Sequence, residues 1–352
     1  MQRIGKTLKR KSTSRYRGSR FAVALASAFA AALLAFSLVA CAPSDASTAS
    51  KYSGVDGFDA SDISKNDFRA TPSVMDSIPQ TTGLETFTLT NSGKHVAAPK
   101  LASDETAAIK SAISAVEEYG DVSLVLINLD TGCGIAYNPD APVYGAGSFK
   151  APYALYICET FVENGAFSIP GISALGDDDF YGEGSFVKSL IENAVVNSDN
   201  DSFATLRGMY DFQGFDEWIT ALGATDATYT DESWFPWYSA RSSAKLWAEM
   251  LEYWRGGSDT ALWLQSLCAE TNQSFLRDAT EPLGAEVLNK AGWCSGYDYD
   301  LDFNSICDAG VVRIGNEFYL ASVMTGAPDD DDNRALVEEL IAALFTARDS
   351  LA

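Results

Sequence analysis

Three short motifs carry the residues of this chain that could do chemistry. They are Gly147-Ser148-Phe149-Lys150, Ser198-Asp199-Asn200 and Lys290-Ala291-Gly292. Hydroxyl, amine and amide groups of this kind can pass protons and hold a polar ligand. The single histidine, His95, lies outside all three motifs. A Ser-His-Asp triad and a histidine-rich metal site are therefore excluded, so acid–base chemistry must come from Lys, Glu, Asp, Ser or Tyr.

The spacing within the first motif decides which side chains can meet. On a helix, positions 147 and 150 lie within about 60° of each other, whereas positions 148 and 150 lie about 200° apart. Lys150 can thus activate a nucleophile at position 147, where Gly147 has no side chain. Ser148 is the substitute that residue type suggests, and the helical geometry speaks against it.

The elements that must position these residues form a mixed pattern. Periodicity predicts a helix over 103–118, two strands over 122–129 and 134–137, helices from 148 to about 268, and three strands over 286–293, 306–314 and 317–325. A last helix over 334–348 follows an acidic run, which favours the positive end of the helix dipole. The order predicts an α/β fold, in which an α+β sheet domain is interrupted by an all-α lobe.

The three motifs, in this order and in these contexts, resemble the class A β-lactamase and transpeptidase-like family of penicillin-recognising serine hydrolases. The resemblance extends over residues 103–352. Two further segments carry it, Tyr137-Asn138-Pro139-Asp140 before the first motif and Asp308-Ala309-Gly310-Val311-Val312 after the third.

The resemblance implies a role for each matching residue. Lys150 would take the proton of the nucleophile, and Ser198 would pass a proton to the leaving nitrogen. Asn200 would bind the substrate amide and Lys290 its carboxylate, while Gly292 would let the strand approach the substrate closely. The family has its nucleophilic serine at the position of Gly147.

Two further departures from the family concern binding and deacylation. Ala291 lacks the hydroxyl that helps to hold the carboxylate, and no Glu-x-x-Leu-Asn motif follows the second motif, where Glu232 is the remaining candidate. The alternate acids Asp298, Asp300 and Asp302 are interpreted as a solvated hairpin tip, since the glycine and glutamate of a calcium loop are missing. No metal or cofactor is expected.

The start of the chain indicates export. A basic stretch over residues 1–20 precedes an apolar run that ends at Leu38-Val39-Ala40-Cys41, which resembles a bacterial lipobox. An ordinary membrane anchor that ends in a cysteine is the alternative. We expect a signal peptide over 1–40, a lipidated Cys41 with a flexible linker over 41–102, and the β-lactamase-like domain over 103–352. The protein would be lipid-anchored on the outer face of the cytoplasmic membrane, with residues 86–90 as a short strand at the domain edge.

Charge and cysteine content restrict the partners. The chain has 48 acidic and 25 basic residues, and eight of the basic ones lie in the leader. This acidity excludes nucleic acid as a partner. Cys294 and Cys307 flank a predicted hairpin and are the first choice for a disulfide, whereas Cys158 is expected to be a buried apolar residue.

Two classes of function are compatible with these residues. The first is a catalytically impaired cell-envelope protein that keeps Lys150, Ser198, Asn200 and Lys290 to bind a cell-wall peptide, a β-lactam or a protein. The second is an active serine β-lactamase-type hydrolase that uses Ser148 or another route. A lipoprotein with a vestigial site is a third possibility.

Overall fold

The computed structural model describes residues 58, 68–172, 182–228, 235–296 and 303–352. The chain divides into two units, residues 1–49 and 50–352, and all described residues belong to the second. Cys41, Glu232 and the acidic residues 298, 300 and 302 lie outside the described residues. None of the helices in the described ranges combines the length and the apolar content that a membrane span requires.

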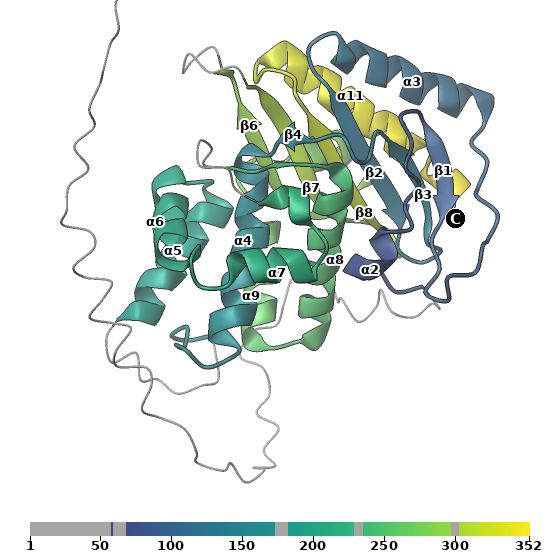
Figure 1. The fold of residues 1–352 in the computed structure, drawn as a ribbon. Coiled ribbons are helices and arrows are strands. Elements are labelled where there is room, and N and C mark those ends of the chain that lie inside the picture. The colour runs from purple at the N-terminus through teal and green to yellow at the C-terminus, as the bar shows by residue number, and fades with distance from the viewer. Residues whose placement is uncertain (1–57, 59–67, 173–181, 229–234, 297–302) are drawn as a thin grey trace, which may run out of the picture. The chain divides into compact units, whose positions relative to one another are not determined.

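A six-stranded antiparallel sheet forms the centre of the domain (Figure 1). Its strand order is β1-β3-β2-β8-β7-β6. The strands are β1 (Glu85–Thr88), β2 (Val122–Asn128), β3 (Cys133–Tyr137), β6 (Glu286–Cys294), β7 (Ser305–Ile314) and β8 (Glu317–Thr325). The five strands expected from 122 to 325 are confirmed to within one residue at their ends.

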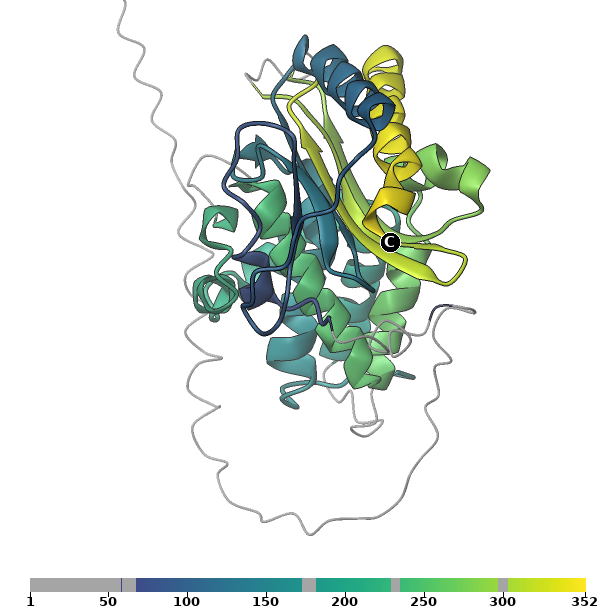
Figure 2. The same ribbon diagram turned by 90° about the vertical axis from the view of Figure 1, so that its right-hand side faces the viewer.

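Helices cover both faces of this sheet (Figures 1 and 2). The first face packs on α3 (Ser103–Glu117) and α11 (Asp331–Thr346), and the second packs on α8 (Ala240–Gly256). In β2, Leu124 and Leu126 belong to the apolar cluster on the first face, while Val125 and Ile127 belong to the cluster on the second. A strand covered on both faces reads as a continuous apolar run, as Val122–Asn128 does.

The all-α lobe lies between β3 and β6 in the chain. Its remaining helices are α4 (Lys150–Ile157), α5 (Glu183–Val196), α6 (Asn200–Tyr210), α7 (Phe215–Ala221), α9 (Asp259–Ala269) and α10 (Phe275–Thr280). A π-helical turn over Cys158–Val162 follows α4, and Cys158 is fully buried in it, as the sequence predicts. The predicted sheet domain with an inserted helical lobe is confirmed.

The domain begins well before residue 103, so the predicted boundary of the linker is wrong. β1 pairs with β3 and confirms the strand expected at the domain edge. The short helix α2 (Pro72–Met75) packs on α8, and Phe68, Met75 and Ile78 are buried. Phe58 meets Trp254 and Phe318 edge to face, with ring centroids 6.0 and 5.5 Å apart.

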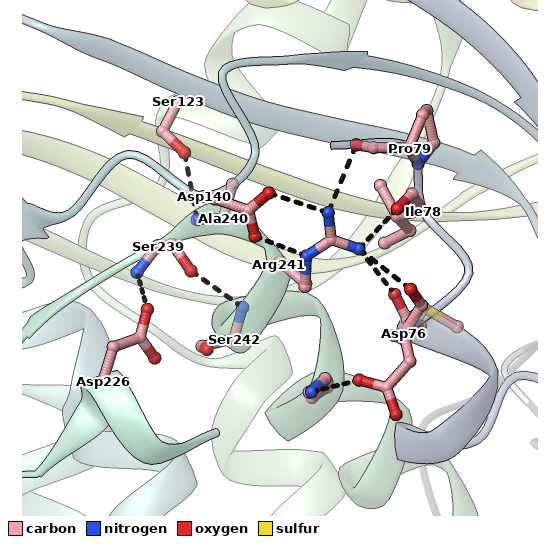
Figure 3. A network of polar contacts seen from close by, with 12 residues as sticks. Asp76, Ile78, Pro79, Ser123, Asp140, Asp226, Ser239, Ala240, Arg241 and Ser242 are labelled. Atoms are coloured by element: carbon pink, nitrogen blue, oxygen red, sulfur yellow. Dashed lines mark hydrogen bonds and ion pairs between the residues drawn. The ribbon is translucent and has the colours of Figure 1, made fainter. Parts of the chain in front are cut away.

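Two basic residues of α8 hold this N-terminal segment (Figure 3). The Arg241 guanidinium donates to both carboxylate oxygens of Asp140, at 2.6 and 2.9 Å, and to backbone carbonyls that include those of Met75 and Ile78. One turn later, Lys245 Nζ lies 2.6 Å from Asp76 Oδ1. The segment before residue 80 is therefore tied to α8 and to the turn that leads to Gly147.

Candidate functional site

The third motif lies directly against the first. Strand β6 carries Lys290-Ala291-Gly292 past a 3₁₀ turn over Ala146–Phe149, which leads into α4. A Cβ placed on Gly292 would lie 2.3 Å from Ser148 N and 2.5 Å from Gly145 O. Because such contacts are too short for a real carbon atom, only glycine allows the strand and the turn to approach this closely.

The backbone of the second motif places its hydroxyl between two amines. Ser198 has a φ of 55°, a left-handed conformation that is uncommon for a serine. Asp199 Oδ1 accepts a hydrogen bond of 2.7 Å from Ser202 N and so caps α6. Lys150 Nζ and Lys290 Nζ lie 3.3 and 3.1 Å from Ser198 Oγ. The three motifs therefore meet at the Ser198 hydroxyl.

Lys150 is buried within this cluster. Its Nζ donates to Asn200 Oδ1 at 2.7 Å and to the carbonyl oxygen of Ser198. Burial and, to a smaller extent, the charge of Lys290 together lower the pKa of Lys150 to about 7, although the charge of Asp199 opposes the shift. A neutral amine is thus accessible near pH 7, as proton transfer from a neighbouring nucleophile requires.

Lys290 is completely buried. Its Nζ also donates to Ala291 O at 2.7 Å and lies 5.5 Å from the ring centroid of Trp293. Burial lowers the pKa of Lys290 to about 8, and the negative charge of Asp308 opposes this shift. Both lysines in the site therefore have pKa values below that of an exposed lysine, because burial removes the water that stabilises their charge.

Asp308 on β7 influences Lys290 through its charge, and the sequence analysis did not identify it as a site residue. Its Oδ1 accepts a hydrogen bond of 2.6 Å from Asn289 Nδ2, and its Oδ2 accepts one of 2.9 Å from Leu276 N. Burial raises the pKa of Asp308 to about 6, although these hydrogen bonds and the charge of Lys290 act to lower it. The register pairs Asp308 with Ala291 and Lys290 with Ala309, so the two charged side chains leave opposite faces of the sheet and the effect of Asp308 on Lys290 is electrostatic.

Gly147 points its α-carbon into the cluster. A Cβ at this position would lie 2.9 Å from Ser198 Oγ and 3.3 Å from Ala291 O. A side chain here would therefore meet the Ser198 hydroxyl, to which both lysine amines donate. The expected relationship between position 147 and Lys150 agrees with this geometry, although the segment is a 3₁₀ turn followed by an α-helix rather than one regular helix.

Ser148 is engaged elsewhere. It is fully buried, and its hydroxyl donates to Gly145 O at 2.6 Å. The Tyr238 hydroxyl lies 2.7 Å from Ser148 Oγ. With its one proton committed to a carbonyl, the Ser148 hydroxyl has no base beside it and is a poor candidate nucleophile.

Two stacked phenyl rings flank Lys150. The centroids of Phe235 and Phe203 lie 5.4 and 6.0 Å from Lys150 Nζ, and the rings are parallel at 5.0 Å. Within the described ranges, the hydrogen-bond partners of Lys150 Nζ are a carbonyl, a hydroxyl and an amide, with no carboxylate among them. In the sequence, the aromatic run that contains Phe235 favours packing over a substrate wall, because nothing local shows that it reaches Lys150.

The predicted disulfide between Cys294 and Cys307 is wrong. Cys307 is a free thiol that lies 3.1 Å from Ser305 Oγ. The register of β6 and β7 places Cys294 opposite Ser305 and Cys307 opposite Gly292. The two cysteines are diagonal neighbours, about 7–8 Å apart in such a ladder, which is beyond the reach of a disulfide.

Comparison with known proteins places the whole domain in one family. The model of the β-lactamase enzyme family matches residues 106–347, more than half of the chain. No curated protein matches the sequence. Several solved structures share the fold at low sequence identity.

A serine-to-glycine variant of the extended-spectrum β-lactamase TLA-1 is 16% identical with a TM-score of 0.52, over 68% of this chain and 99% of that one. PBP-A is 15% identical with a TM-score of 0.56, over 72% of this chain and 99% of its own. A β-lactamase from Chitinophaga pinensis is 18% identical with a TM-score of 0.54, over 69% and 98%. The fold class expected from the sequence is confirmed, and the chain belongs to the β-lactamase enzyme family.

Proposed function

We propose that this protein is a cell-envelope member of the family that binds a β-lactam or a cell-wall peptide without hydrolysing it. Gly147 is the observation that carries the proposal. A Cβ at this position would lie 2.9 Å from Ser198 Oγ, to which Lys150 Nζ donates, and a nucleophilic hydroxyl would have to stand there. A site that keeps its proton-transfer groups and lacks the attacking atom can bind a ligand but cannot form an ester with it.

The surroundings of Lys150 support the same conclusion. Hydrolysis of an acyl intermediate needs a base that activates water. The rings of Phe203 and Phe235 occupy one side of Lys150 Nζ, and an apolar surface there disfavours an ordered water. The Ser148 hydroxyl, bonded to Gly145 O, offers no second route.

The ligand chemistry follows from the charges of the cluster. Lys290 presents a buried amine next to Ser198 Oγ, and Asn200 and Ser198 supply groups that can bind an amide. A carboxylate compensates buried positive charge, and its arrival raises the lysine pKa values. The ligand class is therefore an amide that carries a carboxylate, as β-lactams and cell-wall peptides do.

Export and anchoring belong to the same proposal. The sequence Leu38-Val39-Ala40-Cys41 supports cleavage before Cys41 and lipidation of its thiol, which would hold the domain on the outer face of the cytoplasmic membrane. Changing Cys41→Ala should leave uncleaved precursor without a lipid label in cells fed a labelled fatty acid. Undiminished labelling of that variant would exclude the lipoprotein assignment.

Intact-mass spectrometry and calorimetry with benzylpenicillin test the binding function. We expect no covalent adduct and a saturable heat of binding that the isosteric change Lys290→Met weakens at least tenfold. The matched control is Lys188→Met on α5, which should bind as the wild type does. Absence of binding to the wild-type protein would overturn the proposal.

The second candidate is an active serine hydrolase. The retained set of Lys150, Ser198, Asn200 and Lys290 favours it, because a binding protein does not need both proton-transfer groups. A penicillin adduct mapped to Ser148 by peptide sequencing would establish it and would exclude the binding protein.

A further inference from the structure

An N-terminal segment over residues 68–80 lies outside the family match, which begins at residue 106. It is called the N-terminal strap below. Its helix α2 packs on α8, and the side chains of Met75 and Ile78 are buried. The strap is therefore an addition to the part of the fold that carries the site.

Two basic side chains of α8 hold the strap (Figure 3). Arg241 donates to the carbonyl oxygens of Met75 and Ile78, at 3.0 and 2.6 Å. Lys245 forms an ion pair of 2.6 Å with Asp76. Because Lys245 is buried, the carboxylate of Asp76 offsets part of the cost of removing its charge from water. The strap is thus bound through two buried cations.

The same part of α8 holds the chain that enters the site. The Arg241 guanidinium donates to both carboxylate oxygens of Asp140, and the backbone N–H of Arg241 donates to Pro139 O at 2.9 Å. Shortly after Asp140, β4 (Val143–Tyr144) leads into the turn over Ala146–Phe149. One guanidinium therefore binds both the strap and the chain that enters the site.

The N-terminus of α8 is also joined to the strand that pairs with β4. This strand is β5 (Trp237–Tyr238), and it is followed directly by Ser239, the N-cap of α8. Pro236 O, just before β5, accepts a hydrogen bond of 3.0 Å from Gly145 N, just after β4. Helix α8 therefore begins at the end of a two-stranded ribbon whose other strand leads into the turn that carries Gly147.

This ribbon meets the site at two points. The Tyr238 hydroxyl lies 2.7 Å from Ser148 Oγ, next to Gly147. The ring centroid of Phe235, just before the ribbon, lies 5.4 Å from Lys150 Nζ. Closely packed elements transmit displacements to their neighbours, so a shift of the first turn of α8 would move both the turn at Gly147 and the ring beside Lys150.

We infer that the N-terminal strap positions the site, and that Arg241 and Lys245 are the positioning residues that transmit its docking. When the strap is displaced, its carbonyls no longer hold the Arg241 guanidinium, and Asp140 loses a partner of fixed position. The turn at Gly147 is then free to shift with the first turn of α8. The inference goes beyond the proposed function and holds for any ligand of the site.

Hydrogen–deuterium exchange of the full-length protein tests this role. Asp76→Lys places a second cation against Lys245, and the Asp76 side chain is 64% exposed, so the change creates no cavity. We expect exchange to become at least about fivefold faster in residues 71–80, and also in 143–149 and 235–238, because the local opening spreads. Asp76→Glu keeps the ion pair and should retain the wild-type pattern.

The matched control is Glu192→Lys on α5. It makes the same change of charge at a partly exposed ion pair with Lys188 and should leave exchange in 143–149 and 235–238 as in the wild type. Thermal unfolding confirms that each variant is folded. Asp76→Asn, which removes the charge without adding a cation, is measured in the same way where the lysine variant does not fold.

The pattern of exchange separates positioning from simple stabilisation. Faster exchange confined to residues 71–80, or unchanged exchange in all three ranges, would overturn the inference, because the strap would then have no influence on the site. Uniformly faster exchange that includes 286–294 would overturn it as well, since it reports a general loss of stability. The measurement contains no ligand, so its failure leaves the proposed function to be judged by the benzylpenicillin titration alone.

Discussion

A Cβ on Gly147 would lie 2.9 Å from Ser198 Oγ. The contact is short, but it involves the end of a side chain that can rotate, so a larger residue at position 147 needs only a small shift of the Ser198 hydroxyl. The site therefore keeps nearly enough room for a nucleophile that the sequence no longer provides.

Restoring that nucleophile should restore the first half of the chemistry. The variant Gly147→Ser should form a covalent penicillin adduct at residue 147, because Lys150 and Ser198 already stand within hydrogen-bonding distance of each other. The adduct should persist, since among the described residues the rings of Phe203 and Phe235, and no carboxylate, flank Lys150 Nζ. Intact mass followed over hours measures both steps.

Gly147→Ala is the matched control, because it adds the same Cβ without a hydroxyl and should stay unmodified. A Gly147→Ser protein that is folded by circular dichroism yet remains unmodified would show that the site has lost more than one residue.

The buried lysines should make stability depend on pH. The pKa of Lys150 falls from 10.5 to about 7 on folding, so between these values the unfolded chain binds more protons than the folded one. Stability from this group therefore rises with pH across that window and is lowest below pH 7. Lys150→Met removes the titrating group, so the stability of the variant relative to the wild type should fall as pH rises from 7 to 10.

Thermal unfolding at pH 7, 8.5 and 10 measures this difference. Lys290→Met should show the same sign over a narrower window, because the pKa of Lys290 falls only to about 8. A variant whose stability relative to the wild type stays constant, or rises with pH, would contradict the assigned direction.

Arg241 should be a large contributor to stability. Its guanidinium is buried, and removing it leaves Asp140 and the carbonyls of Met75 and Ile78 without their donor. Because one partner of a buried network is lost, Arg241→Ala should lower the free energy of unfolding by about 3 kcal/mol in urea titrations.

The control for Arg241 is a surface pair. Lys188 lies 3.9 Å from Glu192 on α5, and both side chains are partly exposed, so Lys188→Ala should cost less than about 0.5 kcal/mol. Equal losses in the two variants would show that the Arg241 network is no stronger than a surface ion pair.

The N-terminal boundary of the domain is open to a direct test. A chain that begins at residue 58 keeps Phe58, Met75 and Ile78 and should unfold at the wild-type temperature. A chain that begins at residue 81 loses these buried side chains, at about 1.5–3 kcal/mol each, and leaves Arg241 without its carbonyl partners. It should therefore fail to fold cooperatively, and a cooperative transition near the wild-type temperature would show that the segment before residue 81 is dispensable for the fold.

The sequence by itself determined the element types and the three motifs. Mainly apolar runs such as Val122–Asn128 identified buried strands, and helical spacing separated Gly147 from Ser148 as partners for Lys150. These signals are local, because each depends on residues a few positions apart. The cap of α6 is equally local, since Asp199 accepts its hydrogen bond from Ser202 N, three positions later in the chain.

The tertiary structure decided whatever depends on partners that lie far apart in the chain. Phe235 stands beside Lys150 although 85 positions separate them, and Arg241 holds carbonyls from residues 75 and 78. The segment before residue 103 has few large apolar residues and reads as a linker, yet those few are buried because α8 and the sheet edge supply the other half of each contact.

The register of the sheet could not be predicted from the sequence either. Two cysteines on adjoining strands can be opposed or diagonal, and a shift of two residues changes one into the other without altering either strand's pattern. The pairing of Cys294 with Ser305 is fixed instead by the whole β6–β7 ladder, including the close approach of Gly292 to the turn at Gly145. Sequence patterns report which face a residue takes, whereas packing of the complete sheet determines which residue it meets.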